Sequence, residues 1–93
     1  MKTDQYESVW DAIEDTPEQA ENMRLRAELM HALREHVKGS GWSQAEAASH
    51  LGVTQPRISD LTRGKISLFS LDNLIRLAVA AGMRVSLTID RAA

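Results

Sequence analysis

Residues 42–65 read WSQAEAASHLGVTQPRISDLTRGK, and the first half of this stretch predicts a short helix. Ser43 and Glu46 form a capping box, because the serine hydroxyl can accept the backbone N–H three residues on while the glutamate reaches back to the serine N–H. The helix therefore begins at Gln44. Gly52 ends it, since a left-handed residue at the C-terminal side of a helix is least strained at glycine.

The second half of the stretch predicts another helix, which follows after a short Gly-Val-Thr turn. Thr54 is a favourable N-cap, and Pro56 fits the first turn, where its missing N–H costs nothing. The helix is expected to run from Gln55 to Arg63, because Gly64 supplies the next stop. Two short helices joined so closely must cross steeply.

The side chains of these two helices divide into a buried seam and a polar face. The seam is small or apolar, as a close crossing requires, and consists of Ala47, Ala48, Leu51, Val53, Ile58 and Leu61. The outward face of the second helix carries groups of the types that bond base edges in DNA, namely Thr54, Gln55, Arg57, Ser59, Asp60 and Arg63. The pattern indicates a helix-turn-helix. A plain helical hairpin within a bundle is the alternative.

Residues 44–65, QAEAASHLGVTQPRISDLTRGK, resemble the helix-turn-helix of lambda-repressor and Cro-type proteins, the xenobiotic-response-element (XRE) regulators. This resemblance implies a phosphate-contacting glutamine at Gln44 and base-reading residues at Thr54 and Gln55. The next position is often polar in these proteins, but here it is Pro56, which cannot donate a hydrogen bond to a base. Specificity is therefore expected to depend on the neighbours of Pro56.

The expected DNA contacts combine these positions with others chosen for their side-chain chemistry. Amide, guanidinium and hydroxyl groups bond base edges, whereas cations neutralise the phosphate backbone. The candidate base-reading residues are Thr54, Gln55, Arg57 and Ser59. The candidate phosphate contacts are Gln44, Arg63 and Lys65.

Length and composition exclude several classes of protein. Ninety-three residues allow one domain with a modest core, and the absence of cysteine excludes a disulfide framework and a thiolate metal site. The start MKTDQYES lacks the apolar run that export would need, and no stretch approaches the ~20 apolar residues of a membrane span. We therefore expect a cytoplasmic protein. No catalytic pair or ligand cluster is found, so no enzyme, cofactor or metal is expected.

Charge is divided unevenly along the chain, whose formal net charge is −2. Residues 1–21 contain one lysine and seven carboxylates, a sum of −6, so the remaining residues carry +4. The basic part can approach phosphate while the acidic part faces water or a basic protein.

The acidic segment 1–15 places four apolar residues on one face of a short helix: Tyr6, Val9, Trp10 and Ile13. Two interpretations are open. The helix packs on its own domain, or it binds a partner, since tryptophan is enriched among interface anchors. The stretch SVWDAIEDTPEQAENMRLRAELM and the strand-like tail resemble HigA-like antitoxins. That resemblance implies a small RelE/HigB-like toxin as the partner.

A long helix is predicted ahead of the helix-turn-helix. Thr16 and Gln19 form a capping box around Pro17, and the helix runs to about Lys38, where a Gly-Ser-Gly sequence stops it. Its core stripe is expected to be Met23, Ala27, Met30, Leu33 and Val37, widened by Leu25 and Leu29.

A further helix is predicted behind the helix-turn-helix, after an apolar loop at residues 66–69 that should fold back on the domain. Ser70 caps this helix, which runs to about Ala81 before Gly82 ends it. Its expected core stripe is Leu71, Leu74, Ile75, Ala78 and Val79.

Residues 83–90 alternate apolar and polar side chains, which is the pattern of a half-buried strand. No other segment is expected to pair with it, so its simplest partner is the same strand in a second copy of the chain. Antiparallel pairing about Leu87 sets Arg84 against Asp90 of the other copy, whereas parallel pairing would oppose like charges. The expected dimerisation residues are Arg84, Val85, Leu87, Ile89 and Asp90.

The sequence thus predicts an all-α, lambda-repressor-like helix-turn-helix bundle with one C-terminal β-strand paired across a homodimer. Its parts are the acidic segment 1–15, the helix-turn-helix domain 16–82, and the dimerisation strand and tail 83–93. The expected function is repression through a palindromic double-stranded DNA operator. As the resemblance implies, the repressor is also the antitoxin of a toxin–antitoxin pair. One alternative is a stand-alone repressor, and another is a protein-interaction module that uses the helix-turn-helix as scaffold.

Overall fold

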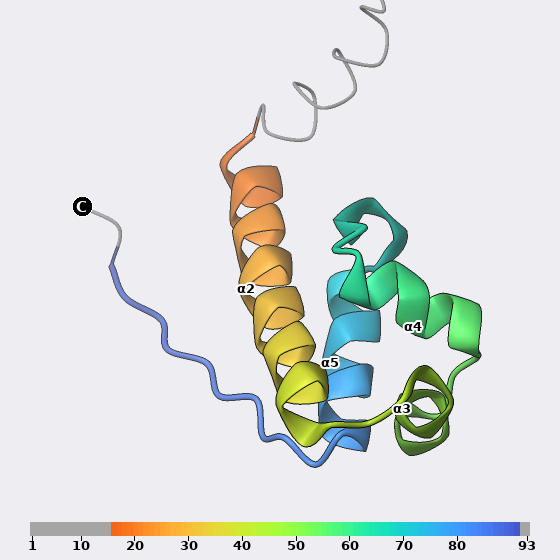
Figure 1. The fold of residues 1–93 in the computed structure, drawn as a ribbon. Helices are drawn as coiled ribbons and strands as arrows, with labels where there is room; N and C mark the ends of the chain where they lie inside the picture. Colours follow the sequence, from red (N-terminus) through yellow and green to blue (C-terminus); the bar gives the residue numbers. More distant parts are fainter. Residues whose placement is uncertain (1–15, 92–93) are drawn as a thin grey trace, which may run out of the picture.

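A computed structural model describes residues 16–91, and the regular elements within that range are all helical (Figure 1). They are α2 (Pro17–Ser40), α3 (Gln44–Leu51), α4 (Gln55–Thr62), the short 3-10 helix η1 (Ile66–Leu68) and α5 (Leu71–Ala80). α2 packs chiefly on α5, and α3 packs chiefly on α4. The α3–α4 pair is the predicted helix-turn-helix, and it lies beside the α2–α5 pair (Figure 1). The predicted apolar stripe of segment 1–15 lies outside the described residues.

The capping box that starts α3 is confirmed in both directions. The Glu46 backbone nitrogen donates to Ser43 Oγ at 3.1 Å, and the Ser43 backbone nitrogen donates to Glu46 Oε1 at 2.9 Å. Gly52 ends the helix at a φ of 70°, a left-handed conformation that favours glycine. α2 ends at Ser40 rather than near Lys38, because the left-handed C-cap is Gly41.

α4 begins at Gln55 as predicted, but its cap differs from the expected one. Thr54 has the extended backbone of an N-cap, yet its side chain makes no capping hydrogen bond. The Thr54 carbonyl instead accepts the backbone N–H groups of Arg57 and Ile58, each at 3.1 Å. The helix stops at Thr62, and Gly64 follows at a φ of 72°.

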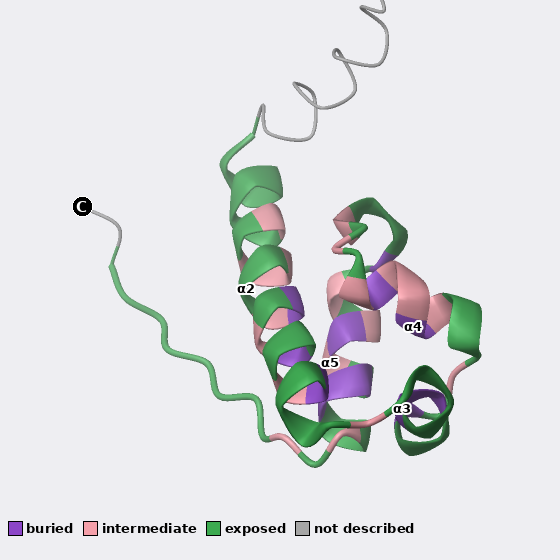
Figure 2. Ribbon diagram, in the orientation of Figure 1, coloured by how far each residue is buried: buried purple, intermediate pink, exposed green. Residues whose placement is uncertain are grey.

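One apolar core lies where the four helices meet (Figure 2). The predicted seam of the helix-turn-helix is buried, except that Val53 is half-buried. Phe69 is only 1% exposed, so the loop after η1 folds back onto the core as predicted. The buried residues are Met30, Leu33, Val37, Ala47, Ala48, Leu51, Ile58, Leu61, Phe69, Leu74, Leu77 and Ala78.

The predicted stripes of α2 and α5 are only partly correct. On α5 the buried face is Leu74, Leu77 and Ala78, while Val79 is 61% exposed. On α2 the first half of the stripe is not buried, and Ala27 is exposed. The exposure of the first half of α2 follows from its length. At roughly 1.5 Å per residue α2 is about 36 Å long and α5 about 15 Å, so α5 cannot cover α2 along its whole length.

The predicted C-terminal strand is wrong for the single chain, because residues 83–91 carry no strand. A strand is defined by hydrogen bonds to a neighbouring strand, and no segment within residues 16–91 supplies one. The tail instead starts beside α2 and α5 and then diverges from α2 toward its end (Figure 1). An apolar groove of ≈ 300 Å³ lies between α2, α5 and the start of this tail. None of the helices within residues 16–91 combines the length and apolar character that a membrane crossing requires.

Candidate nucleic-acid interface

The amino-terminal end of α4 is exposed. Thr54, Gln55 and Pro56 are exposed there, while Ile58 is 1% exposed and faces the core. α4 therefore buries one face and leaves its first turn available. Because its side chain is exposed, the Gln55 amide is available to a base edge. Ser59, one turn after Gln55 and half-buried, continues the same face.

Arg57 lies elsewhere, although it was predicted to read bases with Gln55. Its Nη1 donates to the Leu68 carbonyl at 2.9 Å, and its guanidinium carbon lies 4.0 Å from the centroid of the Phe69 ring. Arg57 thereby ties α4 to the loop that follows it. To reach a base, Arg57 would have to give up both contacts. No local spacing in the sequence connects residue 57 with residues 68 and 69.

Two further arginines bond to backbone carbonyls at the end of α4 and in the loop between α4 and α5, and sequence reasoning missed both. Arg26 Nη1 donates to the carbonyls of Ile66 and Phe69, each at 3.3 Å. Arg34 Nε donates to the Thr62 carbonyl at 3.2 Å. Carbonyls at the end of a helix or in irregular backbone lack a helical N–H partner, and the arginines bond two such carbonyls, those of Thr62 and Phe69. The donors and acceptors are 28 to 43 residues apart, so only the fold brings them together.

The three predicted phosphate contacts lie on both sides of α4. Gln44 is the first residue of α3, and its side chain is exposed. Arg63 and Lys65 are exposed on the loop that follows α4. Lys65 Nζ lies 3.7 Å from Asp60 Oδ1, whereas Arg63 makes no side-chain hydrogen bond or ion pair with another described residue. Of these two cations, Arg63 is therefore the one whose charge has no partner within the described residues.

Arg24, on the amino-terminal half of α2, is paired with neighbouring carboxylates. It hydrogen-bonds Glu21, and its Nη1 lies 3.7 Å from Glu28. The hydrogen bond and the charge of Arg24 lower the pKa of the Glu21 carboxyl, and the same contact raises the pKa of Arg24. The positive charge predicted for residues 22–93 is thus not all free to meet DNA.

Trp42 joins the end of α2 to α3 through two histidines for which no role was predicted. The Trp42 and His50 rings stack with centroids 4.1 Å apart and an interplanar angle of 13°. The His36 ring meets Trp42 edge-on at 5.8 Å. These contacts fix the segment that leads into the capping box at Ser43. They form no metal site, and within residues 16–91 no three histidine or carboxylate side chains are grouped to hold one.

The predicted dimerisation residues are all exposed in the single chain, with Leu87 at 71% and Ile89 at 82%. Arg84 and Asp90 make no ion pair or side-chain hydrogen bond within the described chain. The predicted toxin-binding residues Tyr6, Val9, Trp10 and Ile13 lie outside the described residues.

Comparisons with known proteins agree with this geometry. The profile of a helix-turn-helix domain family matches residues 12–90. A solved structure described as a putative XRE-family transcriptional regulator is 33% identical in sequence, with a TM-score of 0.71. The match covers 78% of this chain and 82% of that one. No curated protein sequence matches. Because the family profile covers most of its length and the XRE-family structure is 33% identical, the chain belongs to the helix-turn-helix domain family, XRE type.

Proposed function

We propose that this protein is a DNA-binding transcriptional regulator that recognises its sites with α4. The observation that carries the proposal is the division of α4 into a face buried by Ile58 and Leu61 and an exposed first turn that holds Thr54 and Gln55. Such a helix can enter the major groove, where its first residues meet base edges. The XRE-family regulator of similar fold supports the same function.

The roles of individual residues follow from their exposure and contacts. Gln55 can bond an adenine edge through both its amide groups, and Thr54 and Ser59 supply hydroxyls beside it. Gln44 and Arg63 are candidates to hold the backbone on either side of the reading helix. Arg57 supports the reading helix instead of reading bases, because its guanidinium is engaged by Leu68 and Phe69. Lys65 forms an ion pair with Asp60, so it is expected to be a weaker phosphate contact than Arg63.

The proposed regulator is a homodimer, because one chain carries one reading helix and a palindromic operator presents two half-sites. The tail supports this proposal through its alternating pattern and the exposure of Leu87 and Ile89. In the dimer, residues 83–90 of two copies pair antiparallel about Leu87 and gain the ladder hydrogen bonds that the single chain cannot make. Arg84 then faces Asp90 of the other copy.

An antitoxin role is the narrower form of the proposal. It is supported by the resemblance of the flanking sequence to HigA-like antitoxins and by the acidic charge of residues 1–21, which suits a basic RelE/HigB-like toxin. Tyr6, Val9, Trp10 and Ile13 would contact that toxin. A stand-alone repressor would show no such partner, and a protein-interaction module would bind no DNA.

The two glutamines at the starts of α3 and α4 allow a matched test of the DNA-reading proposal. The test measures fluorescence anisotropy on a selected operator duplex and on a random duplex. Gln55→Ala should weaken operator binding by ~1 to 3 kcal/mol and leave random binding nearly unchanged, since it reads a base. Gln44→Ala should weaken both duplexes alike. Equal losses on both duplexes for Gln55→Ala would remove that residue from base readout.

A further inference from the structure

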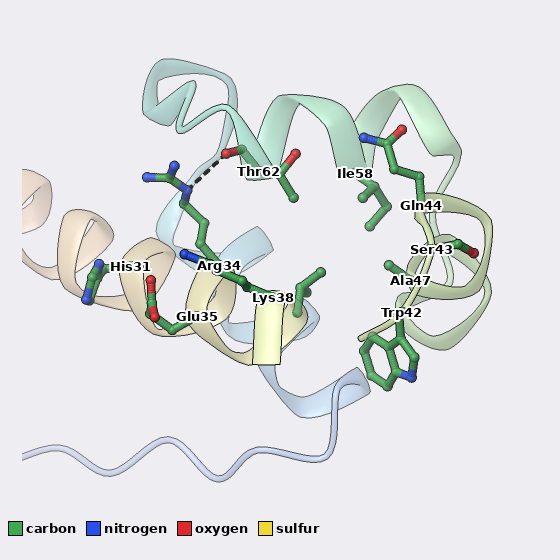
Figure 3. A pocket seen from close by; sticks show the side chains of 11 residues that line it. His31, Arg34, Glu35, Lys38, Trp42, Ser43, Gln44, Ala47, Ile58 and Thr62 are labelled. Carbon is green, nitrogen blue, oxygen red and sulfur yellow. Dashed lines mark hydrogen bonds between the residues drawn. The ribbon is translucent and has the colours of Figure 1, made fainter. Parts of the chain in front are cut away.

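An open hollow of ≈ 480 Å³ lies between α2, α3 and α4, beside the reading helix (Figure 3). Its polar lining includes His31, Arg34, Glu35, Lys38, Gln44 and Thr62. Figure 3 shows the α2 side chains on one side of the hollow and Gln44 on the other. The hollow thus connects α2, for which only a core role was predicted, with a predicted phosphate contact.

Arg34 is held in this hollow with part of its hydrogen-bonding capacity unused. Its Nε donates to the carbonyl of Thr62, the last residue of α4. Its Nη1 packs so closely on Gly64 that a Cβ there would lie 3.1 Å away. Neither terminal nitrogen has a hydrogen-bond or ion-pair partner among the described residues. Arg34 therefore presents positioned, unpaired donors of the kind that bind phosphate oxygens.

Lys38 lies one helical turn after Arg34 on the same side of α2 and lines the same hollow. It makes no ion pair with any described residue, and it is exposed. Glu35 is the single carboxylate among the residues that line the hollow, and it is also without an ion-pair partner among residues 16–91. The lining therefore carries two cations against one anion, which favours an anionic ligand.

We propose that this hollow binds a backbone phosphate of the DNA duplex, with Arg34 and Lys38 of α2 as the cationic contacts and Gln44 beside them. The inference rests on the proposed function and extends it, because it adds a helix outside the helix-turn-helix to the DNA interface. The DNA backbone is favoured over a free small anion for two reasons. The hollow is open to solvent, and it is lined by Gln44, the first residue of α3, and by Thr62, the last residue of the reading helix.

Lys38→Gln tests the inference, because the Lys38 side chain makes no ion pair within residues 16–91 that the substitution would remove. The full chain is titrated with an operator duplex and a random duplex at several salt concentrations. Lys38→Gln should weaken both by roughly five- to tenfold at about 0.1 M salt and lower the salt slope by about 0.9 per lost contact. Glu35→Gln should have the opposite sign and tighten both duplexes.

Arg76→Gln is the matched control, because Arg76 is a cation of α5 that does not line the hollow. Arg76→Gln changes the net charge by the same amount as Lys38→Gln, but it should leave the salt slope of DNA binding unchanged. A Lys38→Gln protein that behaves like Arg76→Gln would overturn the inference. A shift of the Lys38 and Gln44 amide resonances by inorganic phosphate, with DNA binding unaffected in Lys38→Gln, would also overturn it and assign the hollow to a small anion. If the unaltered protein binds no duplex at low salt, the proposed function itself fails.

Discussion

The guanidinium of Arg57 lies 4.0 Å above the centre of the Phe69 ring while its Nη1 bonds the Leu68 carbonyl at 2.9 Å. This arrangement joins α4 to the loop that contains Arg63 and Lys65. The loop region is also held from α2 by Arg26 and Arg34. The surface expected to meet DNA is thus attached to the core partly by arginine side chains that bond backbone carbonyls.

Arg57→Ala should lower the free energy of unfolding by ~1 to 2 kcal/mol, because it removes a cation–π contact and a charged hydrogen bond. Chemical denaturation measures the loss. Arg63→Ala is the control, since Arg63 is exposed and makes no such contact within the described chain, and it should change stability by about 0.5 kcal/mol or less. Equal stabilities for the two variants would show that Arg57 has no supporting role.

Substitution by alanine should change the stability of the fold in opposite directions at two glycines. Gly64→Ala should destabilise the fold by ~1 to 2 kcal/mol, because Gly64 has a φ of 72° and a Cβ would lie 3.1 Å from Arg34 Nη1. Gly39 lies inside α2, and a Cβ added there would meet no atom within 4 Å, so Gly39→Ala should stabilise by ~0.5 to 1 kcal/mol. Thermal unfolding of both variants checks the signs, and a stabilising Gly64→Ala would contradict the described loop geometry.

The two N-caps of the helix-turn-helix should differ in energy. Ser43→Ala removes an observed capping hydrogen bond and should cost ~1 kcal/mol. Thr54→Ala should cost well under that amount, because the Thr54 side chain makes no such bond. Denaturant titration gives both values. A Thr54→Ala loss as large as that of Ser43→Ala would show that the threonine caps α4 in solution.

Leu87→Pro tests the proposed tail-to-tail dimer. Proline removes a backbone donor at the centre of the paired strands, so the variant should keep its helical circular dichroism and become monomeric by light scattering. It should also lose operator affinity by several orders of magnitude, since the two half-sites are no longer bound together. Leu87→Val retains a strand-forming residue and should stay dimeric. A dimeric Leu87→Pro protein would place the interface elsewhere, for example on the exposed Val79 side of α5.

The features that could be predicted from the sequence are those that depend on neighbouring residues. The capping box at Ser43 and the left-handed Gly52 fix α3 within a few residues, so local pattern was sufficient. The contacts of Arg26, Arg34 and Arg57 join residues that are well separated along the chain, and no periodicity reveals them. The burial of Leu77 in place of Val79 depends on how α5 is rotated against α2, which also lies beyond local pattern.

The tail shows a different limit of prediction from sequence. Its alternating pattern describes a segment with one apolar face, but a strand needs a neighbouring strand before its backbone can form the ladder. The predicted hydrogen bonds therefore belong to an assembly and not to the single chain. The exposed Leu87 and Ile89 are the part of that prediction that the single chain retains.

Selection of bound sequences from a random pool of DNA duplexes by the full-length protein tests the central claim most directly. We predict enrichment of a palindrome whose half-sites lie about one helical turn apart, with affinity that falls steeply as salt rises. We also predict that Gln55→Ala enriches a sequence altered at one symmetric pair of positions. No enrichment over the starting pool, or the same palindrome from Gln55→Ala, would contradict the claim that α4 reads DNA.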